Sequence, residues 1–222
     1  MKTEHVLKRG LKDIFAAEIL IDDNETNTAQ DGETPNHGFV TGEPFHLIPA
    51  GEMSRNAENE KTDVFYDDTV FDTIGKEGAT EVSITGAALR PDLLARINNK
   101  HIDTTTGAVL DTGEFKPKYF ALGGTSENTD GTEEKFWFMK GTFAIPEQAD
   151  KTKDDSTDTN GQTLVYSAVR TTHRFTVGSE ETGMKRVVID TSITNVKSTK
   201  DWNAQVVTPD NLSDIVEKVV QG

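Results

Sequence analysis

A chain of 222 residues without cysteine is long enough for one large β domain, but it cannot form a disulfide scaffold, a thiolate metal site or a cysteine nucleophile. The net charge of −15, from 38 acidic and 23 basic residues, argues against a protein that binds duplex DNA by neutralising its phosphates. This composition fits a solvated acidic surface, and it also fits a surface that repels nucleic acid.

The amino-terminal region is expected to be a charged arm over residues 1–13, followed by a core strand over the apolar residues 14–21. The arm lacks the continuous apolar stretch of an export signal, and no apolar run in the chain approaches the length of a membrane span. We therefore expect a protein that is made in the cytoplasm and has no membrane partner. Residues 22–36 are polar and rich in turn formers, which predicts a long loop.

Residues 38–60 are predicted to form two extended segments. In the first, over residues 38–50, Pro44 and Pro49 favour an edge or bent strand. The second covers residues 52–60. If it is extended, alternate positions place side chains that are all polar and mostly acidic on one face, namely Glu52, Ser54, Asn56, Glu58 and Glu60. On spacing alone, a plain solvent-exposed strand or loop is the better interpretation of this pattern.

Residues 62–99 carry the clearest pattern in the chain, which reads as strand, acidic turn, strand and helix. In the second strand, Val82 and Ile84 alternate with polar residues, the period of a sheet with one buried face. Pro91 then occupies the first position of a short helix over residues 91–98. A helix this short must lie on a sheet, and its expected packing residues are Leu89, Leu93, Leu94 and Ile97.

The remaining chain is predicted to be mainly β up to residue 207, so that residues 14–207 form a single domain. A hairpin is expected at Asp130-Gly131, and its flanking strands are apolar at both parities, which predicts cover on both faces. The strands of this part are expected over residues 118–122, 135–143, 163–172, 175–177 and 184–189, with a hairpin turn at 177–183 and a last strand at 202–207. Residues 208–222 are predicted to be a helical extension, whose apolar stripe over residues 209–220 needs the domain or another subunit as partner.

Residue patterns that carry catalysis or metal binding are largely missing from the sequence. The histidines are scattered singly at His5, His37, His46, His101 and His173. Residues 156–167 resemble a calcium loop only in part, because Ser156 and Ser167 occupy its end positions. Asp67 and Asp68 could form an acid–base couple with nearby aspartates, but acidic turn residues need no catalytic explanation. With no P-loop, dinucleotide or serine-hydrolase motif, we predict a protein without enzymatic activity, cofactor or metal site.

The order and spacing of these elements resemble the major tail proteins, or tail tube proteins, of long-tailed phages (siphoviruses), of the phi13-type family. The resemblance rests on Lys12-Asp13 before the first strand, the Phe65-Tyr66-Asp67-Asp68 element, the passage VSITGAALRPDLLARI, and the strand from Tyr119 to Leu122 beside the strand from Phe136 to Phe143. It covers most of residues 10–207.

The resemblance implies a β-sandwich or barrel-like tail tube fold with one flanking helix. Six copies would form a ring whose inner strands close into one β-barrel, and stacked rings would form a tube through which DNA passes. The polar positions of residues 52–60 would line an acidic lumen, since a smooth negative wall lets a polyanion slide. The arm and the long loop would contact the next ring, and the loop residues expected to do so are Asp22, Asp23, Asn24, Glu25, Asp31 and Glu33.

The same resemblance implies a virion protein of the phage tail whose partners are further copies of itself. Tape measure, tail terminator and tail initiator proteins are the other expected partners, and double-stranded DNA would pass without specific binding. Two other classes stay open on sequence alone. A non-catalytic β-sandwich adhesin or carbohydrate-binding module would need an exposed aromatic platform, such as Trp137 or Trp202. A β-sandwich hydrolase is less favoured, for want of a convergent set of catalytic groups.

Overall fold

The computed structural model describes residues 7–25, 37–66, 69–114, 116–146, 161–192, 196–199 and 201–218. Strands dominate these residues, which confirms the predicted mainly β fold. The strands are β1 (Lys8–Asp22), β2 (Phe39–Thr41), β3 (Phe45–His46), β4 (Ala50–Tyr66), β5 (Thr69–Ala87), β6 (His101–Ile102), β7 (Val109–Leu110), β8 (Phe120–Asn128), β9 (Glu133–Phe143), β10 (Gly161–Val169), β11 (Arg174–Val177), β12 (Glu180–Gly183), β13 (Arg186–Asp190), β14 (Val196–Ser198) and β15 (Glu217–Lys218). The helices are α1 (Pro91–Ile97) and α2 (Leu212–Ile215).

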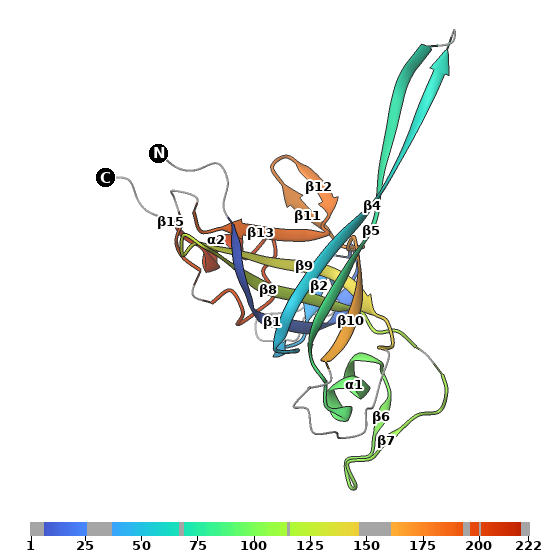
Figure 1. Ribbon diagram of the computed structural model, residues 1–222. Helices are drawn as coiled ribbons and strands as arrows, with labels where there is room; N and C mark the ends of the chain where they lie inside the picture. Colours follow the sequence, from blue (N-terminus) through green and yellow to red (C-terminus); the bar gives the residue numbers. More distant parts are fainter. Residues whose placement is uncertain are drawn as a thin grey trace, which may run out of the picture.

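One antiparallel sheet organises the molecule, with the strand order β2-β1-β8-β9-β10-β5-β4. Two further strands join it, because β3 pairs with β1 and β13 pairs with β9. The sheet curls so that β10, β5 and β4 cross over β8 and β9 (Figure 1). The hairpin of β4 and β5 then runs far beyond the body, while α1 with β6 and β7 forms a small lobe at the opposite end (Figure 1).

Two apolar cores hold the curled sheet together. The first lies inside the curl, where Phe120, Phe136 and Phe138 meet Ile84 and Tyr166 from the overlying strands. The second lies on the outer face of β8 and β9, where Trp137 and Met139 pack with Phe175, Trp202 and Val207. Residues 136–139 of β9 are therefore buried on both sides, as the apolar residues at both parities predicted.

The amino-terminal arm predicted over residues 1–13 is wrong for residues 8–13. These residues belong to β1 and pair with the far end of β8, from Lys8 opposite Asn128 to Lys12 opposite Thr125. Two of their charges are paired with β9, since Lys8 forms an ion pair with Glu134 at 3.1 Å and Lys12 with Glu133 at 2.6 Å. Because this end of the strand is exposed on both faces, it lacks the apolar alternation by which a strand is recognised in sequence.

The predictions for the last fifty residues also need correction. The strand at 175–177 pairs with β12, inside the segment predicted to be a turn, and β13 instead extends the main sheet beside β9. Trp202 lies in a turn, and the described part of the predicted helix over 209–220, up to residue 218, contains only the four helical residues of α2. The backbone becomes extended at Val216, with φ −100° and ψ 105°, and β15 pairs with β14. This bend buries both Ile215 and Val216 in the second core, so the domain itself is the partner of the apolar stripe.

Gly123 of β8 permits the close packing of the second core. It lies opposite Trp137 in the sheet, and a Cβ at this position would come within 2.6 Å of the indole ring. We expect Gly123→Ala to lower the free energy of unfolding by about 1–3 kcal/mol, because the buried ring has to move. Urea denaturation measures this loss. The matched control is Gly10→Ala in β1, where no atom lies within 4 Å of the added carbon; an equal loss in both variants would contradict the packing explanation.

Candidate functional site

A surface that is polar except for Val165 covers the outer face of β4, β5 and β10, and we call it the polar sheet face. In antiparallel strands, directly opposed residues lie on the same face. The strand registers therefore build three rows across the sheet, which are Glu52–Thr85–Thr163, Ser54–Ser83–Val165 and Asn56–Glu81–Ser167. The hydroxyl oxygens of Thr85 and Thr163 lie 3.0 Å apart, which fits two side chains that point to one side.

The opposite side of the same strands anchors this surface to the first core. Val82, Ile84, Leu164 and Tyr166 are fully buried there. The Tyr166 hydroxyl donates a hydrogen bond of 2.7 Å to the backbone oxygen of Phe120 in β8. Burial raises the pKa of Tyr166 well above its ordinary value, so the group stays a neutral donor. The strands are therefore a rigid support, with the polar groups held on the side away from the core.

All charged side chains of the polar sheet face are acidic. Its charged members are the exposed carboxylates Glu52 and Glu81, and its three rows contain no lysine or arginine. Glu58 is also exposed on β4, but it lies beyond the end of β10, where the sheet has only two strands. The Glu60 side chain lies outside the described residues. The face predicted from alternation in residues 52–60 is thus present for Glu52, Ser54 and Asn56, while sequence reasoning missed the contributions of β5 and β10.

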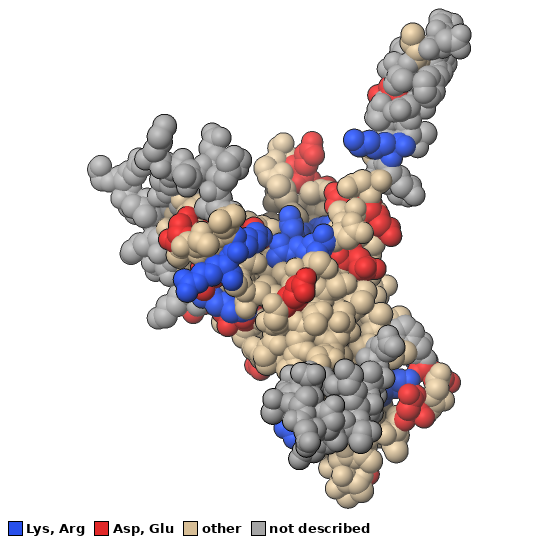
Figure 2. All heavy atoms as spheres, viewed as in Figure 1, with Lys and Arg blue, Asp and Glu red and all other residues tan. Residues whose placement is uncertain are grey.

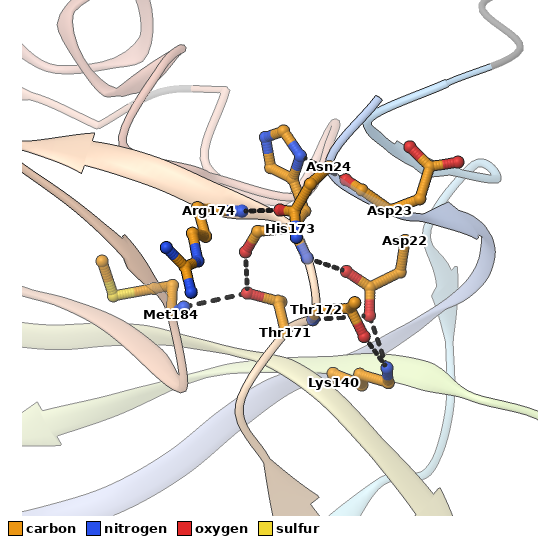
Figure 3. Close-up of polar contacts among 9 residues, drawn as sticks. All are labelled: Asp22, Asp23, Asn24, Lys140, Thr171, Thr172, His173, Arg174 and Met184. Atoms are coloured by element: carbon orange, nitrogen blue, oxygen red, sulfur yellow. Dashed lines mark hydrogen bonds and ion pairs between the residues drawn. The ribbon is translucent and has the colours of Figure 1, made fainter. Parts of the chain in front are cut away.

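A second polar cluster ties the end of β1 to the connection between β10 and β11 (Figure 3). The carboxylate of Asp22 accepts hydrogen bonds from the backbone N–H groups of Thr172 at 2.9 Å and His173 at 2.7 Å. The same carboxylate forms an ion pair with Lys140 of β9, whose ammonium group also donates to the Thr172 hydroxyl. We call these four residues the Asp22 corner.

The ion pair of the Asp22 corner is partly shielded from solvent, since the side chains of Asp22 and Lys140 are 7% and 13% exposed, whereas Thr172 is exposed. Burial opposes ionisation of the carboxyl. The hydrogen bonds from His173, Lys140 and Thr172 outweigh burial and hold the pKa of Asp22 below its ordinary value. Next to it, the Asn24 side-chain oxygen accepts from the backbone N–H of Arg174 at 2.9 Å. These contacts join segments that are about 150 positions apart in the sequence.

The loop residues predicted to contact another ring have different surroundings in the structure. Asp22 ends β1 instead of lying in the loop, and its carboxylate is occupied by internal contacts; its contact with another ring stays a prediction. Asp23 and Asn24 bind neighbouring backbone groups of the same chain. Glu25 is exposed and lies 3.1 Å from the His37 ring nitrogen. Asp31 and Glu33 lie outside the described residues.

The flanking helix lies on the first core, as predicted, but with a slightly different face. Leu94 and Ile97 are buried in that core, and Leu89 packs against it. Leu93 is only half-buried, and Ala95 takes an inward position instead. Pro91 is at the predicted first position of the helix. The helix therefore has a structural role.

The other functional readings find little support in the residues that the structure describes. These residues include no group of three or more histidine, aspartate or glutamate side chains that could hold a metal ion. Trp137 and Trp202 are fully buried, so neither is the exposed aromatic platform that a carbohydrate-binding module would need. In the same described residues, no helix is long and apolar enough to cross a bilayer. The proposed acidic turn at Asp67 and Asp68 lies outside them.

Models of known protein families do not match this chain, and curated protein sequences give no significant match.

Proposed function

We propose that this chain is a structural tail tube protein of a long-tailed phage, which self-assembles into hexameric rings that stack into a tube. The observation that carries the proposal is the polar sheet face, a three-stranded wall with two exposed glutamates and no basic side chain. A wall without lysine or arginine offers DNA phosphates no ion pairs, and its carboxylates repel them. Hydroxyl and amide groups keep such a wall hydrated, so that DNA moves along it without adhering.

The open edge of β4 supports closure of these walls into a ring. Within the described residues, β4 pairs only with β5, so its other edge has no strand partner over 17 residues. Long unpaired edges favour pairing with another chain. In a closed β-barrel each copy would add its strands to those of its neighbour, and no edge would remain. Tape measure, terminator and initiator proteins would then meet the tube, and the protein would reside in the virion.

Negative-stain electron microscopy of the concentrated protein tests the proposal, with rings or tubes as the expected result. Hydrogen exchange on the same samples gives a second readout, because pairing across copies protects the outward amides of β4 in the assembled protein. The exposed strand β12 is the internal control, and its exchange should change little on assembly. A protein that forms no rings or tubes, even when mixed with tail initiation complexes, would overturn the proposal.

A further inference from the structure

Hydrogen bonds between β13 and β9 come from alternate residues of β13. The Lys185 oxygen, just before the strand, accepts from the N–H of Met139, and the N–H of Thr191, just after the strand, donates to the Glu133 oxygen. In an antiparallel pair, residues alternate between facing the partner strand and facing away from it. With the register of β13 on β9, the odd-numbered positions of 185–191 therefore face β9.

The other residues of β13 turn their backbone groups toward a free edge. They are Arg186, Val188 and Asp190. In the part of the chain that the structure describes, β13 pairs with β9 alone, so no strand lies along this edge. Free N–H and C=O groups in a row favour pairing with a further strand. The edge of β13 is therefore a site where another extended segment can add to the sheet.

The side chains along this edge carry charges without partners. Val187 is buried in the second core, so Arg186, Val188 and Asp190 point to the opposite face of the sheet. Arg186 lies near the Phe138 ring, and Asp190 accepts a hydrogen bond from a backbone N–H. Among the described residues, neither of the two charged side chains forms an ion pair. Between them, Val188 is 41% exposed. The edge thus presents a cation, an apolar side chain and an anion in turn.

This pattern is complementary to itself. A second copy can place its β13 antiparallel to the first, with the two Val188 residues directly opposed. Arg186 of each copy then lies opposite Asp190 of the other, because the two positions are equally far from Val188. Directly opposed residues lie on the same face of a sheet, and opposite charges at such positions are stabilising. The backbone groups match as well, since the residues that are opposed are those that face away from β9.

A groove beside this edge adds positive charge at the Arg186 end. Its volume is about 860 Å³, and its charged lining residues are Arg55, Glu77, Arg170, Lys185 and Arg186. Glu77 is neutralised by Lys185 at 2.6 Å. Figure 2 shows basic side chains gathered on the body between β13 and the foot of the hairpin. An acidic side chain that approaches this end of β13 therefore meets a basic surface, which strengthens its attraction.

We propose that β13 pairs with β13 of a second copy of this chain, antiparallel and about a two-fold axis at Val188. The main sheets of the two copies become continuous across this contact. Arg186 and Asp190 fix the register, because a shift by two residues would place a charged side chain opposite Val188. A two-fold contact closes between two copies, whereas a ring of six needs head-to-tail contacts. The proposal therefore goes beyond the proposed tube and does not depend on it.

Disulfide crosslinking tests this contact, because the native chain has no cysteine. Val188→Cys places two thiols opposite each other at a Cα separation of about 5.5 Å, which suits a disulfide. Mild oxidation should convert this variant to a covalent dimer. The matched control is Val177→Cys, since Val177 is a valine of β11 with a similar exposure of 45%. A dimer yield for Val188→Cys no higher than the control yield overturns the proposal.

Charge reversal in the Val188→Cys variant tests the register. Arg186→Glu places like charges together at both ends of the contact and should reduce the dimer yield about tenfold, and Asp190→Lys should do the same. The two substitutions together exchange the charges and should restore the yield. A mixture of the two single variants should form the mixed dimer, which is identified by its mass. An undiminished yield in the single variants, or no recovery in the double variant, overturns the pairing.

Electron microscopy of the same samples separates this contact from the proposed function. Rings or tubes of the native protein, without excess dimer from Val188→Cys, would leave the proposed function intact and overturn the β13 contact. Excess dimer without rings or tubes would do the reverse.

Discussion

Asp22→Asn is expected to lower the free energy of unfolding by about 1–3 kcal/mol, because it leaves the partly buried ammonium group of Lys140 without its counter-charge. The neutral amide oxygen would also be a weaker acceptor than a carboxylate for the backbone N–H groups of Thr172 and His173. Urea denaturation at neutral pH measures the loss. Asp201→Asn makes the same chemical change at an exposed position and is expected to cost little. Similar losses in both variants would contradict the role of the Asp22 corner.

A second substitution distinguishes a lost ion pair from general damage at the Asp22 corner. Removing both charges in Asp22→Asn with Lys140→Met should cost less than Asp22→Asn alone, because no buried charge is then left unpaired. If the double variant loses the sum of the two single losses, the ion pair is not the cause.

The pH dependence of stability follows from the direction of the Asp22 pKa shift. The pKa is lower in the folded protein than in the unfolded chain, so the folded state binds the proton less readily. The contribution of Asp22 is therefore complete above the unfolded value of about 3.9, and it is lost as pH falls through the lower folded value. Relative to the native chain, Asp22→Asn should show a smaller loss of stability on acidification in this range. An unchanged acid profile would contradict the assignment.

Local patterns in the sequence were sufficient to predict the polar sheet face only in part. The alternation around Val82 and Ile84 correctly separated a buried side from a polar side, because a strand has a strict period of two. The alternation at Glu52, Ser54 and Asn56 did the same for β4. Which strands lie next to each other is decided by contacts between distant segments, so the third strand, β10, could not be assigned to this face from spacing.

The Asp22 corner and the grouping of Arg55, Lys185 and Arg186 could not have been predicted from local sequence. Asp22 stands at the start of a polar segment that reads as a loop, and its partner His173 is 151 positions away. Lys185 and Arg186 stand near Arg55 because β13 extends the sheet beside β9, whereas the sequence suggested a hairpin with β11. Because the main contacts of this protein join residues that are distant in sequence, patterns that span a few residues cannot predict its sites.

The polar sheet face gives a second prediction with a large expected effect, which concerns DNA. Glu52→Lys with Glu81→Lys replaces both charged residues of this face, and since both are exposed the fold should be unaffected. In a tube these lysines would line the channel and hold the phosphates that native tubes release. Assembled variant tubes should therefore retain short duplex DNA in co-sedimentation, whereas native tubes should not. With six or more phosphate contacts, the affinity should fall about a thousandfold or more between roughly 50 and 200 mM salt.

Glu180→Lys with Glu181→Lys is the matched control, because it changes the net charge equally on exposed positions of β12. Tubes of this control should hold less DNA and show a shallower salt dependence, since these lysines do not converge on a channel. Equal retention by the two variants would place the polar sheet face on the outside of the assembly. Failure of only the Glu52 and Glu81 variant to form tubes would place this face in a contact between copies. With either result, the channel wall would have to be assigned to another surface of the sheet.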